Sequence, residues 1–431
     1  MTDETKERIA AINTGIIPDG YKKTKVGIVP IEWEVKKILD FCEIIGGGTP
    51  STKNNDYWNG DIPWISSSDL KDNNIYNINI SRYITKKAIE KSATKICPPN
   101  TIHLVSRVGV GKIAFSHCRI CTSQDFVNII KYDCDKLYLV YALYQKLQKE
   151  INNAQGTSIK GITTQEIKNF LISIPPLSEQ QKIAEILSTQ DKLIELYERK
   201  IEQLKTLKKG YLQKMFPKKC AKSPELRFKG FTEPWEKRKL GAVLSLLKDG
   251  THGTHKNSDE GVFLLSAKNI KNGEVYIDEN ADRRISKQEF DSIHSNFRLQ
   301  ENDVLLTIVG SIGEVSILKN PDIMTFQRSV AFLRPKDSLL STFLKTEIES
   351  YDFQKELSNR KSQSAQPGVY LGELEKIPFN LPNVEEQQQI GSYFSNLDRL
   401  ITLHQHKLDK EKQKKKALMQ LLLTGKVRVS T

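Results

Sequence analysis

The sequence has no apolar run long enough to cross a bilayer, and its N-terminus lacks the apolar core of a secretory signal. Of its 431 residues, 38% are hydrophobic and 27% are charged. A transmembrane helix needs about 18 or more consecutive apolar residues, and no such run occurs. Residues Met1–Ala10 are largely charged, which is not typical of a signal peptide. We therefore expect a cytoplasmic protein, not associated with a membrane, with room for about two to four domains.

Cysteine is also scarce, with six residues in the whole chain. Cys97, Cys118, Cys121 and Cys134 lie near one another in the sequence, and Cys118 and Cys121 form a CxxC pair. A zinc ribbon takes its ligands from two such pairs, and the second pair is missing. The pattern therefore favours reduced, mostly buried thiols over a zinc site.

Signatures of catalysis are missing as well. Gly111-Lys112 does not belong to a P-loop, because no glycine stands five positions earlier and Ile113 replaces Ser or Thr. The tetrapeptide Cys97–Asn100 lacks both ends of the Asn-Pro-Pro-aromatic signature of adenine methyltransferases. Zinc-protease, serine-hydrolase and dinucleotide-binding motifs do not occur. The sequence predicts no catalytic residue.

One nuclease-like pattern remains, in which Asp19 precedes Glu34 and Lys36. Two carboxylates and a lysine could hold magnesium and activate water. The pattern is short, and the similar stretch Trp235–Arg238 has no upstream aspartate. A structural role for the Trp33-Glu34 pair, which recurs as Trp235-Glu236, is the favoured interpretation.

Positive charge is in excess, with 65 Lys and Arg against 52 Asp and Glu, a net charge of +13. Such an excess indicates association with polyanions such as nucleic acid. Part of it lies in Lys407–Lys416, within a predicted helix, where it forms a solvated face.

The chain contains a long internal repeat. Glu179-Gln180-Gln181 recurs as Glu386-Gln387-Gln388, 207 positions later, and the apolar register that follows recurs with it. A repeat of this length is a whole globular domain followed by a long helix, rather than a solenoid unit. Two similar domains joined by helices suggest a pseudo-symmetric protein that binds a two-part target.

Heptad spacing predicts long helices over residues 178–215 and 385–422, which most simply pack against each other as a coiled coil. At 1.5 Å per residue, a helix of this length spans about 57 Å. The predicted seam between the two helices consists of Ile183, Leu187, Ile194, Tyr197, Ile201 and Leu204 in the first helix and of Ile390, Phe394, Leu397, Ile401 and Leu408 in the second.

Short strands, turns and a few helices alternate within each predicted globular domain. Residues 62–65, 75–80 and 101–105 are strand-like, and residues 138–153 have helical spacing. The domain organisation predicted from these patterns is an N-terminal arm over 1–20, a first domain over 21–176, a central helix over 177–216, a linker over 217–225, a second domain over 226–381 and a C-terminal helix over 382–431. The arm is either flexible or packed on the helices.

Polar, basic and glycine-rich loops recur at equivalent places in the two domains. Arg and Lys can bind guanine O6 and N7, Asn and Gln can bind adenine N6 and N7, and Ser and Thr can bind bases or phosphates. An exposed Lys or Ser is often only solvated, so the recurrence of these residues in both halves carries the prediction. Candidate DNA-binding residues are Lys53, Ser66, Ser68, Arg107, Lys112, Gln124, Ser158 and Lys160 in the first domain, and His252, Thr254, Lys256, Lys268, Ser311, Gln327, Arg328, Arg360, Ser362 and Gln366 in the second.

These features together resemble the DNA specificity subunits of type I restriction–modification systems. The resemblance rests on the tandem plan, on the Trp-Glu pairs after Pro30 and Pro234, on the Glu-Gln-Gln helix starts, and on the terminal segment Leu421–Lys426. It implies a mixed α/β (α+β) fold, in which two target-recognition domains are separated by two long antiparallel coiled-coil helices with pseudo-two-fold symmetry. It also implies that each domain reads one half of a split sequence in double-stranded DNA.

The same resemblance implies that catalysis belongs to partner chains. Two modification (methyltransferase) subunits would carry S-adenosylmethionine and methylate adenine at N6, and two restriction subunits would use ATP and magnesium. This chain itself would bind no cofactor and no metal. The alternatives are a coiled-coil adaptor that binds protein rather than DNA, and a stand-alone nuclease or methylase.

The resemblance further implies that the two long helices act as a ruler for the unspecified gap between the half-sites, which gives a prediction. Insertion of one heptad into both helices lengthens the pair by about 10 Å, which is about three base pairs of duplex. We expect the gap between the two half-sites to lengthen while their sequences stay the same. Sequencing of methylated DNA measures both properties, and an unchanged gap would refute the ruler.

Overall fold

The computed structural model describes residues 2–72, 74–153, 161–218, 221–362 and 367–429. The chain divides into two units, of which one contains Met1–Tyr197 and Lys407–Thr431 and the other contains Glu198–His406. Each long helix therefore contributes one half to each unit. No helix among the described residues is both long and apolar enough to cross a membrane.

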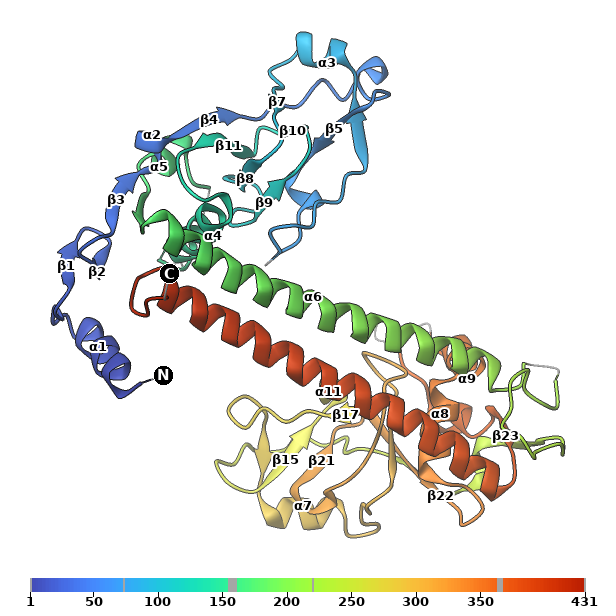
Figure 1. Ribbon diagram of the computed structural model, residues 1–431. Helices are drawn as coiled ribbons and strands as arrows, with labels where there is room; N and C mark the ends of the chain where they lie inside the picture. Colours follow the sequence, from blue (N-terminus) through green and yellow to red (C-terminus); the bar gives the residue numbers. More distant parts are fainter. Residues whose placement is uncertain (1, 73, 154–160, 219–220, 363–366, 430–431) are drawn as a thin grey trace. The chain divides into compact units, whose positions relative to one another are not determined.

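The first unit begins with α1 (Asp3–Asn13) and the hairpin of β1 (Tyr21–Thr24) and β2 (Gly27–Pro30). These elements bind the C-terminal end of the chain. The Tyr21 hydroxyl donates to the Gly425 carbonyl at 2.9 Å, and Lys426 Nζ donates to Asn13 Oδ1 at 2.6 Å. The sequence left residues 1–20 as either flexible or packed, and their described part, residues 2–20, is tied through Arg8 and Asn13 to the segment that follows the last helix (Figure 1).

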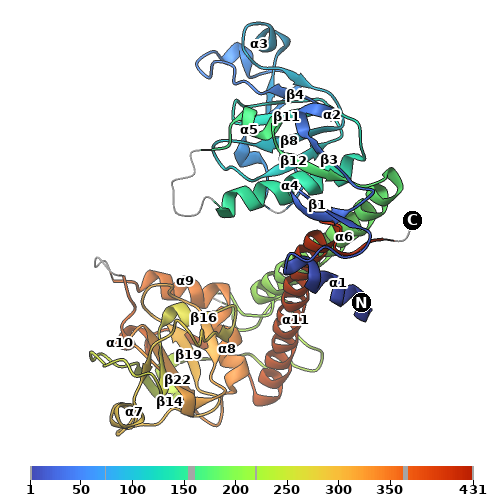
Figure 2. The same cartoon turned by 90° about the vertical axis from the view of Figure 1, so that its left-hand side faces the viewer.

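Two sheets form the body of the first domain. One is antiparallel, in the order β4-β11-β8-β9, and the other is mixed, in the order β6-β5-β10-β7. Their strands are β4 (Cys42–Gly46), β5 (Ile62–Ile65), β6 (Arg82–Ile84), β7 (Ile96–Cys97), β8 (Thr101–Val105), β9 (Ile113–Ser116), β10 (Ile120–Thr122) and β11 (Phe126–Tyr132). Every residue of β8 is buried. The antiparallel sheet packs on α4 (Lys136–Asn153), whose apolar face shares one core with it (Figure 2).

The predicted strands over 62–65 and 101–105 are confirmed as β5 and β8, and the helix predicted over 138–153 is α4. The strand predicted over 75–80 is wrong, because only an isolated bridge between Leu70 and Ile78 forms there. Its isoleucines pack inward without forming a strand: Ile75 is buried in the main core, and Ile78 and Ile80 are half-buried against a smaller cluster. In this segment the apolar residues indicate burial, and they do not indicate strand pairing.

The second domain repeats this plan. An antiparallel sheet has the order β14-β22-β19-β20, a smaller mixed sheet has the order β18-β15-β21, and β16 and β17 form a hairpin. The strands are β14 (Leu244–Asp249), β15 (Val262–Leu265), β16 (Ile270–Lys271), β17 (Glu274–Val275), β18 (Arg284–Ile285), β19 (Val304–Thr307), β20 (Val315–Ile317), β21 (Met324–Phe326) and β22 (Val330–Pro335). The helices are α7 (Lys287–Ile293), α8 (Ser341–Glu349), α9 (Tyr351–Asn359) and α10 (Leu371–Leu374).

A two-stranded ribbon joins the beginning and end of each domain. β3 (Glu34–Lys37) pairs with β12 (Leu171–Ile174), and β13 (Glu236–Lys239) pairs with β23 (Pro378–Leu381), both antiparallel. The short helices α2 (Ile38–Phe41) and α5 (Thr164–Lys168) lie next to the first ribbon. The ribbon brings the two ends of each domain together, so each domain begins and ends at the same place, directly before its long helix.

The long helices are α6 (Leu177–Lys214) and α11 (Val384–Leu422), close to the predicted spans (Figure 1). They are antiparallel, as predicted. In the first unit the beginning of α6 meets the end of α11, where Asp191 pairs with Lys415. In the second unit the end of α6 meets the beginning of α11, where Lys208 pairs with Asp398.

The predicted seam residues fall into two groups. Ile183 and Leu187 lie in the core of the first domain, and Ile390, Phe394, Leu397 and Leu204 lie in the core of the second. Ile201 and Leu408 are buried as well, whereas Ile194, Tyr197 and Ile401 are only half-buried. The beginning of each helix is therefore part of a domain core in addition to a helix–helix seam.

A buried glutamate at the beginning of each long helix explains the repeated Trp-Glu and Glu-Gln-Gln motifs. Trp33 Nε1 donates to Glu179 at 2.9 Å, and Arg428 binds the same carboxylate at 2.7 Å. In the second unit, Trp235 Nε1 donates to Glu386 at 3.1 Å. Arg227 there binds both carboxylate oxygens at 2.7 Å, and this contact raises the pKa of the guanidinium.

The glutamine that follows each glutamate connects the helix to its domain. Gln180 Nε2 donates to the Pro175 carbonyl, and its Oε1 accepts from the Asp135 backbone before α4. Gln387 makes the same contacts, with the Pro382 carbonyl and with the Leu340 backbone before α8. The motif therefore orients each domain on the helix that follows it.

The glutamate contact gives a stability prediction. Arg227→Met leaves the fully buried Glu386 carboxylate without its cation, and breaking a buried pair in this way costs about 3–5 kcal/mol. We expect a correspondingly lower free energy of unfolding in a denaturant titration. Glu385→Ala, one position earlier and exposed, is the matched control and should change stability little. Equal stability of the two variants would contradict this role.

A buried histidine gives a second prediction, on pH. His103 on β8 contacts Asn128 at 2.7 Å and Ser116 at 2.8 Å, and burial lowers its pKa to about 4. In the unfolded chain, the His103 imidazole has a pKa near 6.5. The contribution of neutral His103 to the free energy of unfolding is therefore complete above pH 6.5, and it is lost as the pH falls towards 4. The loss reaches about 3 kcal/mol. A His103→Asn variant should show a weaker pH dependence of its denaturation midpoint over this range, and an unchanged dependence would contradict the assignment.

Candidate nucleic-acid interface

In the first domain, backbone hydrogen bonds join loops from distant parts of the sequence at one edge of the sheets. Gly48 N donates to the Thr122 carbonyl at 2.8 Å, and Ser123 N donates to the Ile65 carbonyl at 2.9 Å. Ser106 N donates to Asp125, and Ile162 N donates to Ser106. We call the segments 47–53, 65–70, 106–112, 122–125 and 161–162 loop cluster 1.

The second domain assembles its loops in the same way. Thr251 N donates to the Phe326 carbonyl and Arg328 N donates to the Thr251 carbonyl, at 2.9 and 3.0 Å. Gln327 N donates to Leu265, and Val369 N donates to Ile308. We call the segments 250–257, 265–269, 308–313, 327–329, 360–362 and 367–370 loop cluster 2. The equivalent loops that the sequence predicted are thus adjacent within each domain.

Glycines at equivalent places shape both clusters. Gly111 has a φ of 101° and Gly313 a φ of 103°, in the region that favours glycine. Gln148 Nε2 on α4 donates to the Gly111 carbonyl at 2.9 Å, and Gln354 Nε2 on α9 donates to the Gly313 carbonyl at 3.0 Å. A helix of each domain therefore holds the turn in place.

Several predicted contact residues are exposed in the two clusters. They are Lys53, Ser68, Arg107 and Gln124 in cluster 1, and His252, Thr254, Lys256, Lys268, Ser311 and Arg328 in cluster 2. Lys268 is still accessible while it pairs with Asp282 at 2.8 Å, and Gln124 Oε1 accepts a hydrogen bond from Thr49. Their side chains are available to a duplex laid across the loops.

Other predicted contact residues have structural partners. Lys112 Nζ donates to the carbonyls of Ser67 and Leu70, so it fastens one loop of cluster 1 to another. The Ser66 hydroxyl bonds to Asp69, and the Ser362 hydroxyl accepts from Gly368 N. Arg360 pairs with Glu356 on α9, and Gln327 is half-buried. We assign these five residues to the shaping of the loops. Ser158, Lys160 and Gln366 lie outside the described residues.

The loop over 250–257 is preorganised by a histidine. His255 Nε2 lies 2.6 Å from the Thr251 hydroxyl, and its Nδ1 lies 2.7 Å from Glu289 Oε1 on α7. Arg283 donates to the His255 carbonyl at 2.7 Å. With these groups turned inward, the alternate residues His252, Thr254 and Lys256 are exposed.

The sequence did not identify arginines that pack behind the loops. Arg82 on β6 donates to Ser66 at 2.6 Å and lies over the Trp64 ring at 4.6 Å. Arg284 on β18, its counterpart, lies over the Phe263 ring at 4.3 Å. Tyr370, which is 69% exposed within cluster 2, is a further candidate for stacking on a base. Strand pairing brings the two arginines to the loops, and no local motif marks any of these three residues.

Five of the six cysteines, Cys42, Cys97, Cys118, Cys121 and Cys134, lie in the first domain with free thiols, and Cys220 lies outside the described residues. Burial raises the pKa of the Cys97 thiol to about 12 and that of Cys121 to about 11, while Cys118 is exposed. In the described ranges, no group of three or more His, Cys, Asp or Glu side chains could hold a metal ion. Glu34, from the nuclease-like pattern, pairs with Lys36 at 2.5 Å.

Comparison with known families gives the same division of the chain. A family model described as the type I restriction modification DNA specificity domain matches residues 30–206 and matches again over residues 232–412. The type I restriction enzyme MjaVIII specificity subunit of Methanocaldococcus jannaschii is 29% identical over 420 residues, which cover 93% of this chain and 94% of the relative. The MjaIX specificity subunit of the same organism is 36% identical over 239 residues, covering 52% and 55% of the two chains.

Solved structures show the same fold. The S subunit of a type I restriction-modification system from M. genitalium superposes with a TM-score of 0.55 at 16% identity, over 93% of this chain and 97% of that chain. A second solved structure addresses complex assembly and conformational transition of the type I R-M system. One of its chains superposes with a TM-score of 0.55 at 15% identity, over 93% of this chain and 99% of that chain.

Proposed function

This chain belongs to the type I restriction modification DNA specificity family, and we propose that loop clusters 1 and 2 each bind one half of a split DNA sequence. It is the DNA-recognition chain of its system and is not itself the catalyst. The observation that carries the proposal is the duplicated loop cluster, in which equivalent loops meet at one edge of each domain and expose Arg, Lys, Gln, Ser and Thr side chains. These side chains can hydrogen-bond base edges and phosphates.

Differences between the clusters support two different half-sites. Cluster 1 presents Lys53, Arg107 and Gln124, whereas cluster 2 presents His252, Thr254 and Arg328. The shared backbone bonds position the loops, and the unlike side chains supply different donor and acceptor patterns. Each good bidentate contact discriminates against a wrong base by about 1–3 kcal/mol.

Partner subunits supply the chemistry in this proposal. The chain assembles with other subunits of its restriction–modification system and with double-stranded DNA. We propose two modification subunits, which carry S-adenosylmethionine, and two restriction subunits, which use ATP and magnesium. A hollow of about 660 Å³ on α6 is one candidate surface for such assembly, and its lining combines Leu207, Gly210 and Tyr211 with charged and polar residues.

Arg328 provides a test. Its backbone N donates to Thr251 within loop cluster 2, and its side chain is exposed. We expect the chain, purified with its modification subunits, to select a split motif from a randomised duplex pool. If Arg328 contacts a base, Arg328→Ala should relax or abolish the base preferences in one half of that motif. If it contacts a phosphate, the variant should weaken binding to all sequences equally, and the slope of log affinity against log salt concentration should fall by about one.

The matched control is Arg238→Ala, which makes the same change in charge on β13 at the entry of the same domain, outside cluster 2. It should leave the selected motif and the salt dependence unchanged. Selection of no split motif by the wild-type complex would refute the proposed function. Equal effects of Arg328→Ala and Arg238→Ala would remove Arg328 from the interface.

A further inference from the structure

A largely buried ion pair joins α6 to α11 in each unit, at equivalent positions of the repeat. In the first unit Lys415 Nζ lies 2.5 Å from Asp191 Oδ1, and the two side chains are 9% and 13% exposed. In the second unit Lys208 Nζ lies 2.6 Å from Asp398 Oδ1, with exposures of 16% and 22%. Both the aspartates and the lysines are 207 positions apart in the sequence, so the repeat preserves the pair itself.

Each pair also reaches into the recognition domain of its unit. In the first unit, the Tyr141 hydroxyl on α4 donates to Asp191 Oδ2 at 2.6 Å. The Tyr76 hydroxyl lies 3.1 Å from the Tyr141 hydroxyl. Tyr76 belongs to the segment between β5 and β6. This chain of hydrogen bonds therefore links the ion pair between the helices to the first domain.

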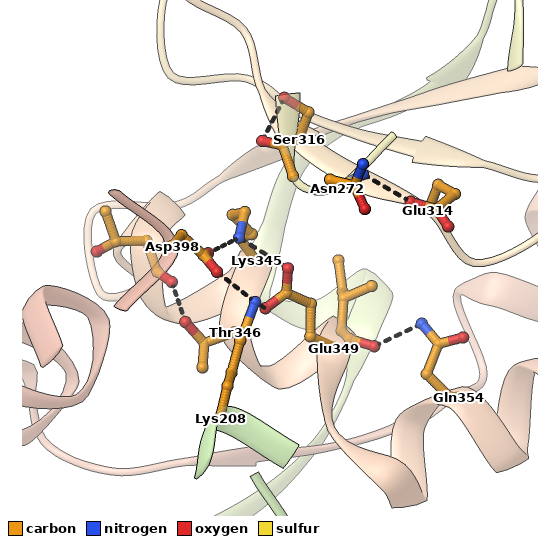
Figure 3. Close-up of polar contacts among 12 residues, drawn as sticks. Lys208, Asn272, Glu314, Ser316, Lys345, Thr346, Glu349, Gln354 and Asp398 are labelled. Atoms are coloured by element: carbon orange, nitrogen blue, oxygen red, sulfur yellow. Dashed lines mark hydrogen bonds and ion pairs between the residues drawn. The ribbon is translucent and has the colours of Figure 1, made fainter. Parts of the chain in front are cut away.

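The second unit has a larger cluster at the same place. Lys345 on α8 bonds to Asp398 at 2.6 Å and to Glu349 at 2.7 Å, and Lys208 bonds to Glu349 at 2.6 Å (Figure 3). The turn of the β16–β17 hairpin lies against it, since a Cβ atom on Gly273 would be 3.3 Å from Lys345 Nζ. Three helices and one hairpin of the second unit thus meet on these charges.

The residues one heptad away from each pair disfavour a shift of α6 along α11 by seven residues. A slip of α6 against α11 by one heptad keeps the apolar seam in phase, and it moves Asp191 from Lys415 to Leu408 or Leu422. The same slip moves Asp398 from Lys208 to Ile201 or Met215. All four of these apolar residues are at least 95% buried, so a slip in either direction would bury two carboxylates against hydrocarbon.

We propose that Asp191–Lys415 and Asp398–Lys208 are register-determining pairs, which fix α6 against α11 and each domain against the helices, and which thereby set the gap between the two DNA half-sites. Buried ion pairs are weak sources of stability, because desolvation offsets their attraction, and their best-attested use is to specify register. These four residues are positioning residues that need not touch DNA. The inference rests on the proposed function, because the gap is a property of the split site.

Gap selectivity tests the proposal separately from stability. The full chain is combined with its modification subunits, and adenine methylation is measured on duplexes that carry both half-sites at the native gap or at gaps up to about four base pairs shorter or longer. A one-heptad slip corresponds to about 10 Å, or about three base pairs. The readout is the ratio of the rate at the native gap to the rate at each other gap, and unfolded protein lowers both rates equally.

The first variant replaces all four residues by leucine, which keeps the seam apolar and leaves Lys345 paired with Glu349. Such replacements are often neutral or stabilising, so we expect a folded protein whose gap selectivity falls by about tenfold or more. A folded variant with the native gap selectivity would overturn the proposal.

Charge reversal provides an independent variant. Lys415→Asp should also reduce gap selectivity, and addition of Asp191→Lys should restore it by reversing the pair. Lys416→Asp makes the same change in charge one position along α11 at an exposed residue, and it should leave selectivity unchanged. Failure of the reversed pair to restore selectivity, or an equal effect of Lys416→Asp, would overturn the proposal. Wild-type methylation of no split site would instead refute the proposed function.

Discussion

The antiparallel packing of α6 on α11 is the constraint on which the rest of the structure depends. Each unit consists of one recognition domain, the beginning of one long helix and the end of the other. The core of the first domain includes Ile183 and Leu187 from α6 together with Met419 and Leu422 from α11. Neither domain completes its core without both helices, so each domain core depends on the pairing of the helices.

The charges at the helix ends follow from this arrangement. A glutamate at the beginning of a helix is favoured by the helix dipole, but Glu179 and Glu386 are buried and need specific cations. Arg428 and Arg227, which follow the ends of α11 and α6, supply them. The arginine that follows one helix therefore binds the glutamate that begins the other, which joins the two halves of the repeat within each unit.

Much of this organisation could be predicted from the sequence, because apolar periodicity is a local signal. The repeat, both long helices, β5, β8, α4 and the positions of the recognition loops follow from such patterns. The roles of Glu179, Trp33 and Arg428 could not be predicted, since their contacts join residues far apart in the chain. Tertiary burial also misled the prediction at Ile75–Ile80, where isoleucines pack on the cores while only an isolated bridge forms.

The candidate interface shows the same limit. Residue type and recurrence located loops such as 106–112 and 310–313, but did not separate exposed residues from those that hold the loops. Lys112, a candidate contact on charge alone, fastens two loops together, whereas Arg82 and Tyr370 carry no motif and lie in or beside the clusters. Partner geometry decides these roles, and only the fold supplies it.

The most direct test of the account exchanges residues 21–176 for the equivalent domain of a relative and co-expresses the chimera with its modification subunit. N6-methyladenine is then mapped in the host DNA. The account predicts a split motif in which one half changes, while the other half and the gap stay as in the parent. A motif altered in both halves, or an unchanged motif, would contradict the assignment of one half-site to each domain.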